Sequence, residues 1–135
     1  MKKFILSLLL FLLPFFSSWA QVYNFLTTSY AQREYNYSTR TWKPWTDWYE
    51  CSVRGVLNLN TCVVIIYSKT TQVYSIVEYL GSYKDAGGGE TLEMKVIDQD
   101  NDKGSIRLRR EKNGNVQLYV DFANVMWVYN VVILN

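Results

Sequence analysis

The sequence predicts an all-β protein that forms one small antiparallel domain of about eight strands. Apolar and polar residues alternate along most of the chain beyond residue 20, and the strand formers Val, Ile, Thr and Tyr recur throughout. No segment carries a helical apolar stripe over a dozen residues. Parallel strands need long crossover connections. The connections here are short, so we expect an antiparallel sheet.

The first 20 residues are expected to be a cleaved signal peptide. Two lysines precede an apolar run over residues 4–16, and the small residues Ser18 and Ala20 stand three and one positions ahead of a cut before Gln21. The apolar run is too short for a spanning helix. We therefore predict a single exported domain at residues 21–135, periplasmic or extracellular, with no membrane anchor after cleavage.

The alternating runs of the remaining chain are predicted to be strands. In the clearest run, Leu92, Met94 and Val96 share one side while Glu93 and Lys95 share the other. Such a pattern is typical of a strand with one buried and one solvated face. The predicted strands lie near residues 22–30, 50–59, 62–68, 72–80, 91–98, 105–111, 116–122 and 125–134.

The connections between these runs carry turn residues. Asn113-Gly114 is the strongest signal for a two-residue hairpin, because both residues tolerate a positive φ. Asn60-Thr61, residues 69–71 and Asn124 are expected to form further tight reversals. Residues 87–89, three consecutive glycines, are expected to lie in a longer, mobile connection.

A meander of eight strands closes most readily into an up-and-down barrel, which leaves no exposed edge. We therefore prefer a lipocalin-like barrel, with a two-sheet sandwich as the alternative, although the Gly-x-Trp opening typical of lipocalins is absent. Residues 125–134 are apolar on both faces, so this strand is expected either to be covered on both sides or to meet a partner. Pairing it with residues 22–30 would close the barrel.

Charge and composition exclude several functions. The chain has 14 Lys and Arg against 12 Asp and Glu, and removal of Lys2 and Lys3 with the signal leaves 12 of each. A neutral domain gives no electrostatic reason to bind nucleic acid. The chain contains no histidine, so the commonest general base and the commonest zinc ligand are missing.

Cys51 and Cys62 are the only two cysteines. An exported compartment permits a disulfide. If Asn60-Thr61 forms the turn, however, Cys62 starts one strand while Cys51 lies far along its neighbour. A disulfide needs Cα atoms within about 7 Å, so two free thiols are the alternative to a bond.

Residues 42–48, the tryptophan segment WKPWTDW, place three tryptophans at a spacing of three. In an extended polyproline conformation Trp42, Trp45 and Trp48 would share one face and form a platform for sugar rings or proline-rich peptides. In a short helical turn the same side chains would close a barrel end as part of the core. With Tyr49, these residues are the predicted ligand-binding set.

Two charged stretches offer weaker hypotheses. Asp98, Asp100 and Asp102 alternate like calcium ligands, but the rest of an EF-hand loop is missing, and acidic turns also form for local hydrogen bonding. Arg107 and Arg109 share a strand face and form either an anion-binding patch or one half of cross-strand ion pairs with Glu93.

The sequence thus favours a binding protein over an enzyme. The expected ligand is a small apolar molecule, a glycan or a protein, held between residues 35–49 and the glycine-rich loop at 83–90. The alternative is a structural or interaction module that uses a strand edge or the apolar C-terminal strand. No cofactor is expected, and an oligomer is possible.

Overall fold

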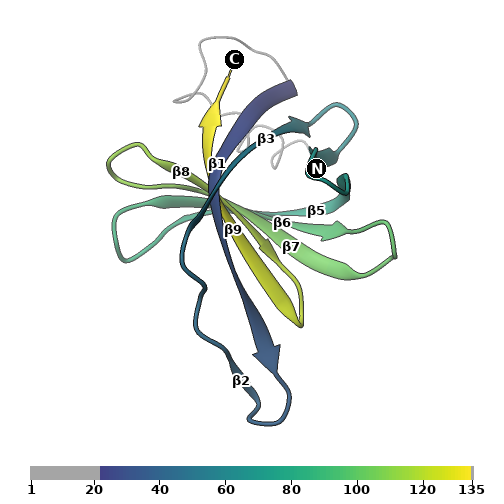
Figure 1. The fold of residues 1–135 in the computed structure, drawn as a ribbon. Coiled ribbons are helices and arrows are strands. Elements are labelled where there is room, and N and C mark those ends of the chain that lie inside the picture. The colour runs from purple at the N-terminus through teal and green to yellow at the C-terminus, as the bar shows by residue number, and fades with distance from the viewer. Residues whose placement is uncertain (1–21, 135) are drawn as a thin grey trace.

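The computed structural model describes residues 22–134, so the expected signal peptide lies outside the described residues. Within that range the protein is all-β, as predicted (Figure 1). The strands are β1 (Val22–Asn36), β2 (Thr41–Trp42), β3 (Tyr49–Asn58), β4 (Val63–Ile66), β5 (Gln72–Lys84), β6 (Glu90–Ile97), β7 (Lys103–Arg110), β8 (Val116–Asp121) and β9 (Val125–Ile133).

Eight of these strands form a closed antiparallel barrel, which confirms the preferred architecture over the sandwich. Every barrel strand pairs with its neighbour in the chain, and β1 also pairs with β9 from Phe25↔Ile133 to Glu34↔Val125. Because each strand reverses direction, the connections alternate between the two ends of the barrel. The links β1–β3, β4–β5, β6–β7 and β8–β9 share one end, called here the mouth end, and β3–β4, β5–β6 and β7–β8 share the other.

The interior of the barrel is an apolar core built from alternate residues of each strand. Met94, Ile106 and Val120 are almost fully buried and come from three successive strands. On β6, Leu92, Met94 and Val96 face inward, as the alternation predicted. Burial of such side chains contributes about 1.5–3 kcal/mol each, so this core is the main source of stability.

Strand β9 is covered over most of its length. Tyr129 and Val131 point into the core, while Val128 on the opposite face is buried beside its register partners Ala31 and Tyr119. Val132, which also faces outward, is 51% exposed. The strand is therefore mostly covered on both sides, with an exposed apolar end.

Two connections differ from their predicted form. The β7–β8 turn has three residues, 112–114. Glu111 N donates a hydrogen bond to Asn115 O and so closes the ladder on either side of them. Of the three turn residues only Gly114 has a positive φ, of 93°. A third residue is required because Lys112 and Asn113 stay at negative φ, as in a type I turn followed by a left-handed glycine. The glycine connection is also short: Asp85 N bonds to Gly89 O across three residues.

Cys51 and Cys62 are free thiols. Val63, which follows Cys62, pairs with Asn58, and Cys51 lies seven residues before Asn58 on β3. At about 3.3 Å per residue, the two cysteines are on the order of 20 Å apart. Strand register therefore keeps the thiols apart.

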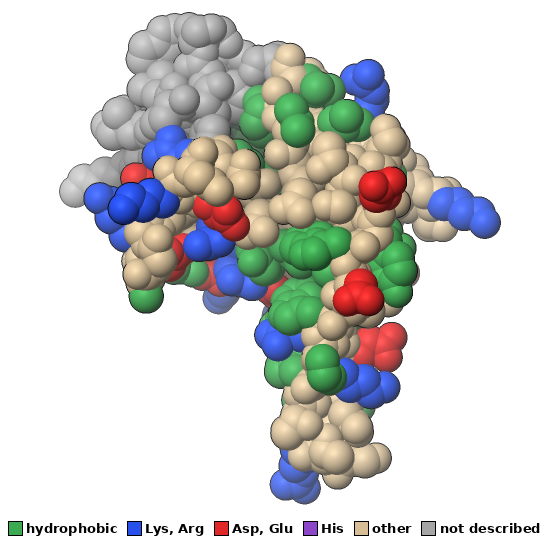
Figure 2. All heavy atoms as spheres, turned by 60° about the vertical axis from the view of Figure 1, so that its left-hand side comes forward, with side chains coloured by type: hydrophobic (Ala, Val, Ile, Leu, Met, Phe, Trp, Pro, Cys, Tyr) green, Lys and Arg blue, Asp and Glu red, His purple; other side chains and the backbone are tan. Residues whose placement is uncertain are grey.

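The sequence did not predict the hairpin that the end of β1 forms with β2. Strand β1 runs past the barrel to Asn36, turns, and pairs with β2 through Tyr35↔Trp42 and Asn36↔Thr41. This two-stranded hairpin, residues 35–42, is called here the arm, and it projects from the mouth end (Figures 1 and 2). Across residues 22–134 the structure contains no helix with the length and hydropathy to cross a membrane.

Candidate functional site

The tryptophan segment lies outside the barrel, alongside the free edge of β1. Lys43 N donates to Glu34 O at 2.9 Å and Thr46 N donates to Gln32 O at 2.8 Å, so the segment continues β2 irregularly until β3 begins. The segment has no regular secondary structure between Trp42 and Tyr49. The segment is not a helical turn that closes a barrel end, because its backbone runs along β1 outside the barrel.

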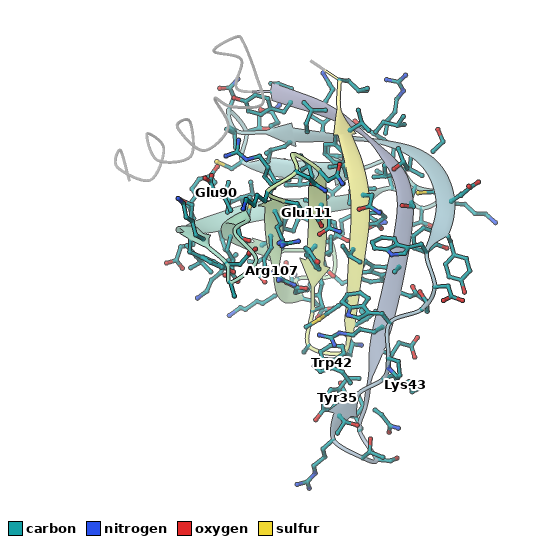
Figure 3. All side chains as sticks on the ribbon, turned by 90° about the vertical axis from the view of Figure 1, so that its left-hand side faces the viewer. Tyr35, Trp42, Lys43, Glu90, Arg107 and Glu111 are labelled. Carbon is teal, nitrogen blue, oxygen red and sulfur yellow. The ribbon has the colours of Figure 1, made fainter. Side chains whose placement is uncertain are left out.

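Two of the predicted binding residues clamp an arginine. The guanidinium carbon of Arg33 lies 5.0 Å from the ring centroid of Trp42 and 4.8 Å from that of Trp45. Arg33 Nε is buried without a hydrogen-bond partner among the described residues. The negative faces of the two rings offset part of the cost of burying this cation. Figure 3 shows Trp42 beside Tyr35 where the arm leaves the barrel, and their rings meet edge-on at 5.4 Å.

The predicted set therefore does not form one flat platform. Trp45 meets Tyr119 edge-on at 6.5 Å, Trp48 is 49% exposed, and Tyr49 packs its ring 5.5 Å from Tyr30. Trp42 and Trp45 both pack against Arg33 on the outer face of β1, whereas Trp45, Trp48 and Tyr49 all keep exposed surface. Ligand binding by these four residues stays a prediction.

A cavity of about 480 Å³ opens at the mouth end of the barrel. The cavity, called here the mouth, lies among the β4–β5, β6–β7 and β8–β9 connections. Three aromatic side chains line it and form its floor: Tyr74, Phe122 and Trp127. The Tyr74 and Phe122 rings lie 6.0 Å apart, and both Phe122 and Trp127 pack against the core. Oxygen- and nitrogen-bearing side chains surround this floor, among them Ser68, Thr70, Gln72, Asp98, Asp100, Asp102 and Asn124.

A hydrogen-bond network fixes the floor. Tyr74 Oη donates to Gln72 Oε1 at 2.5 Å, and Gln72 Nε2 donates to Ser68 Oγ at 3.0 Å and to Tyr129 Oη at 3.3 Å. Trp127 Nε1 donates to Gln32 Oε1 at 3.1 Å. Burial raises the pKa of Tyr74 and of Tyr129 above the usual phenol range, so both stay neutral at physiological pH. The aromatic rings are thus held in fixed positions with their polar ends satisfied.

The three aspartates of the predicted calcium set meet at the rim of the mouth. Their carboxylate oxygens lie within 4.8 Å of one another. Asp98 Oδ1 accepts hydrogen bonds from Asp100 N and Asp102 N, both at 2.9 Å, which is the turn-stabilising role expected from the sequence. Calcium binding by these residues stays a prediction.

The interior of the barrel offers no comparable space. A void of only about 20 Å³ remains among apolar side chains that include Phe25, Ile106 and Leu118. A typical small-ligand site needs about 300–1,000 Å³. A ligand of that size therefore has room in the mouth but not within the barrel.

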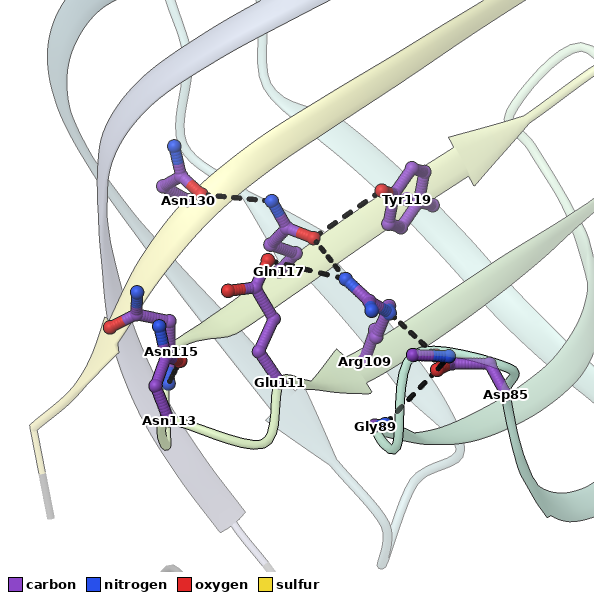
Figure 4. Close-up of polar contacts among 10 residues, drawn as sticks. Asp85, Gly89, Arg109, Glu111, Asn113, Asn115, Gln117, Tyr119 and Asn130 are labelled. Atoms are coloured by element: carbon purple, nitrogen blue, oxygen red, sulfur yellow. Dashed lines mark hydrogen bonds and ion pairs between the residues drawn. The ribbon is translucent and has the colours of Figure 1, made fainter.

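The arginines of β7 are paired with acids, although not with Glu93. Arg107 binds Asp121 through two hydrogen bonds of 2.6 and 3.2 Å. Arg109 Nε donates to Asp85 at 2.7 Å, and Arg109 Nη1 donates to Gln117 at 3.2 Å (Figure 4). These contacts favour the ion-pair interpretation of this stretch over an open anion-binding patch.

The expected pairing of residues 35–49 with the glycine-rich loop at 83–90 is wrong. The first connection lies at the mouth end and the second at the opposite end, because the connections of an up-and-down barrel alternate. The mouth residues Tyr74, Phe122 and Trp127 were missed since each looked like an ordinary strand residue. Their position in the sequence could have identified them, because each lies within four residues of a connection at the mouth end.

Comparisons of the chain with models of known protein families, with curated proteins and with solved structures found no match. The class of the protein therefore follows from its own fold and site: a closed antiparallel β-barrel with a filled interior and an aromatic mouth.

Proposed function

We propose that the protein is a non-enzymatic binding protein that holds a small ligand in the mouth. The ligand has an apolar face and several hydroxyl groups, which is the chemistry of a glycan ring. The observation that carries this proposal is an aromatic floor under a polar rim in a cavity of about 480 Å³. Export to a periplasm or the extracellular space, where free glycans occur, remains part of the proposal.

The floor and rim match the two kinds of surface on a sugar. The C–H face of a sugar ring can pack on Phe122 or Trp127, and aromatic side chains supply large apolar contact areas. Ionised carboxylates such as those of Asp100 and Asp102 accept hydrogen bonds from hydroxyl groups. An apolar surface with a few placed polar groups is the common form of a small-molecule site.

Binding is favoured over catalysis by the groups present. The chain has no histidine. The phenols of Tyr74 and Tyr129 have raised pKa values and so are poor general bases at neutral pH. A site built from neutral phenols and exposed acids is better suited to hold a polyol than to transfer its protons.

A screen of monosaccharides and oligosaccharides by thermal shift tests the proposal, because a ligand that binds only the folded state raises the melting temperature. We expect at least one glycan to stabilise the protein and to change its tryptophan fluorescence. Phe122→Ala and Asn124→Ala should each weaken that binding by about tenfold or more, which corresponds to about 1.4 kcal/mol. Asn124 is exposed, so its variant should keep the wild-type melting temperature.

Trp45→Phe is the matched control on the outer face, and it should leave glycan affinity unchanged. If Trp48→Ala lost glycan binding while Phe122→Ala kept it, the binding site would lie at the tryptophan segment instead of the mouth. Failure of the whole panel to shift the melting temperature would contradict a glycan ligand.

A second candidate function, docking of a partner protein, is favoured by the exposed end of β9. Val132 and Leu134 are 51% and 44% exposed. From Met126 to Val131 both edges of β9 are paired, with β1 and β8. Beyond Val131 only the pairing with β1 continues, so a partner there would meet the outward face of Val132 and the edge that β8 leaves uncovered. Val132→Lys tests this surface. Val131→Lys would not, because Val131 points into the core.

A further inference from the structure

The arm is the least supported element of the described chain. It consists of two strands joined at 37–40, and only two residue pairs connect β1 to β2. An isolated two-stranded hairpin is marginally stable in water. The tip nevertheless presents Tyr37 with 70% of its surface exposed, more than any other large hydrophobic side chain of the described residues. Figure 2 shows the arm standing clear of the barrel.

The conformation of the tip is held by local hydrogen bonds. Asn36 Oδ1 accepts from Ser38 N at 3.0 Å and from Thr39 N at 3.4 Å, and the Thr39 and Thr41 hydroxyls lie 2.7 Å apart. Arg40 adopts a φ of 55°, a conformation that non-glycine residues take at some cost in energy. A tip ordered before binding loses little entropy when it docks. The backbone that carries Tyr37 and Arg40 is thus held by local hydrogen bonds.

The mouth offers this tip both room and charge of the opposite sign. Its aromatic floor can accept the ring of Tyr37. Its rim carries three carboxylates within 4.8 Å of one another and one cation, Lys69, so acids outnumber bases there and the excess charge is opposite in sign to Arg40. The arm and the mouth also lie at the same end of the barrel. With a two-fold axis placed near that end, the arm of each molecule would meet the mouth of the other, and such an interface is closed and self-complementary.

We propose that two copies of the chain form a two-fold dimer in which the arm of each molecule docks in the mouth of the other. Tyr37 packs on the floor formed by Tyr74, Phe122 and Trp127, and Arg40 pairs with Asp100 at the rim. The contact goes beyond the glycan site proposed above and does not rest on it. If both hold, dimerisation and glycan binding compete for the same cavity.

Sedimentation velocity of the purified protein from micromolar to millimolar concentration tests the dimer. We expect the wild type to shift from monomer to dimer over this range, and Tyr37→Ala to stay monomeric. Tyr83→Ala is the matched control, because Tyr83 is 48% exposed at the opposite end of the barrel. It should dimerise like the wild type. Sedimentation velocity of Val132→Lys over the same concentrations separates this dimer from one formed through β9, because the variant should still dimerise if the arm makes the contact.

A charge exchange tests the orientation of the contact. Arg40→Glu and Asp100→Lys should each weaken the dimer by about tenfold or more, whereas both changes in one chain should restore it. Asp98 rather than Asp100 supplies the oxygen that holds the rim turn, so Asp100→Lys preserves the turn. High salt should weaken the wild-type dimer through screening of the pair.

Three results would overturn the proposal. The wild type could remain monomeric at millimolar concentration, Tyr37→Ala could dimerise like the wild type, or Val132→Lys alone could abolish the dimer. Glycan binding is measured separately at micromolar concentration on Tyr37→Ala, so failure of the dimer and failure of the glycan site give different results.

Discussion

Gly55 lies on the interior side of β3, where the Phe25 ring of β1 fills the space that a side chain would take. A Cβ atom built on Gly55 would lie 2.2 Å from Phe25 Cζ and 2.8 Å from the backbone oxygen of Ile65. The phenyl ring could turn away only by leaving a packed core, and the carbonyl belongs to the β3–β4 ladder. Glycine at this position is therefore required by packing rather than by φ.

Gly55→Ala should lower the free energy of unfolding by about 1–3 kcal/mol, the usual cost of adding volume to a full core. Urea unfolding followed by tryptophan fluorescence measures the change. Gly87→Ala is the control: its Cβ would meet its nearest atom at 3.4 Å, an ordinary contact, so its unfolding curve should stay close to that of the wild type. Equal stability of the two variants would contradict the packing argument.

At the scale of elements, the β5–β6 connection is held by one carboxylate. Asp85 Oδ1 accepts from Gly87 N and Gly89 N, both at 3.0 Å, while Asp85 Oδ2 accepts from Arg109 Nε at 2.7 Å. The hydrogen bond from Arg109, together with the two backbone donors, holds the pKa of Asp85 below its usual value of 3.8. This element is thus a structured turn, not the mobile connection that three glycines suggested.

The pKa of Asp85 makes the stability of the protein depend on acid. A carboxyl group with a lowered pKa in the folded state stabilises the fold above its unfolded pKa, and this contribution is lost as pH falls through the folded pKa. Asp85→Asn should therefore be less stable than the wild type at pH 7 and should lose less stability as the pH falls below about 4. Urea midpoints measured across that range test this. If the midpoints of the two proteins fell by the same amount as the pH is lowered, the role of Asp85 would be contradicted.

The sequence located all eight barrel strands but not their full lengths. Alternation identified β6 and β7 to within two residues at each end, because each has one buried and one solvated face. It missed residues 31–36 of β1, whose partners are β2, the irregular segment 43–48 and the start of β9. It also ended β5 early, since two irregularities in the β5–β6 register break the alternation before Lys84.

At the scale of the whole molecule, closure of β1 onto β9 brings the inward side chains of eight strands into one filled core. Ile106 is fully buried and borders the void of about 20 Å³. The fold thus resembles ligand-carrying barrels in its topology but not in its interior. Any small ligand must use an outer surface or the mouth.

Ile106→Ala should create an interior cavity and lower the free energy of unfolding by about 2–5 kcal/mol. The enlarged, dry cavity should then bind xenon or benzene, which the wild-type interior should exclude. Ile65→Ala is a matched control, because Ile65 is only partly buried on the outer side of β4, and it should cost less and bind no probe. Binding of benzene inside the wild type would contradict a filled core.

By itself, the sequence determined the all-β class, the antiparallel pairing and the number of barrel strands, because alternation and short turns are local properties. Only the tertiary structure decided where the functional surfaces lie. The mouth assembles Tyr74 and Trp127 from residues 53 positions apart in the chain, and Trp42 and Trp45 clamp Arg33 instead of forming a platform. Such contacts depend on which strands close the barrel and at which end each connection falls, and no local pattern specifies either.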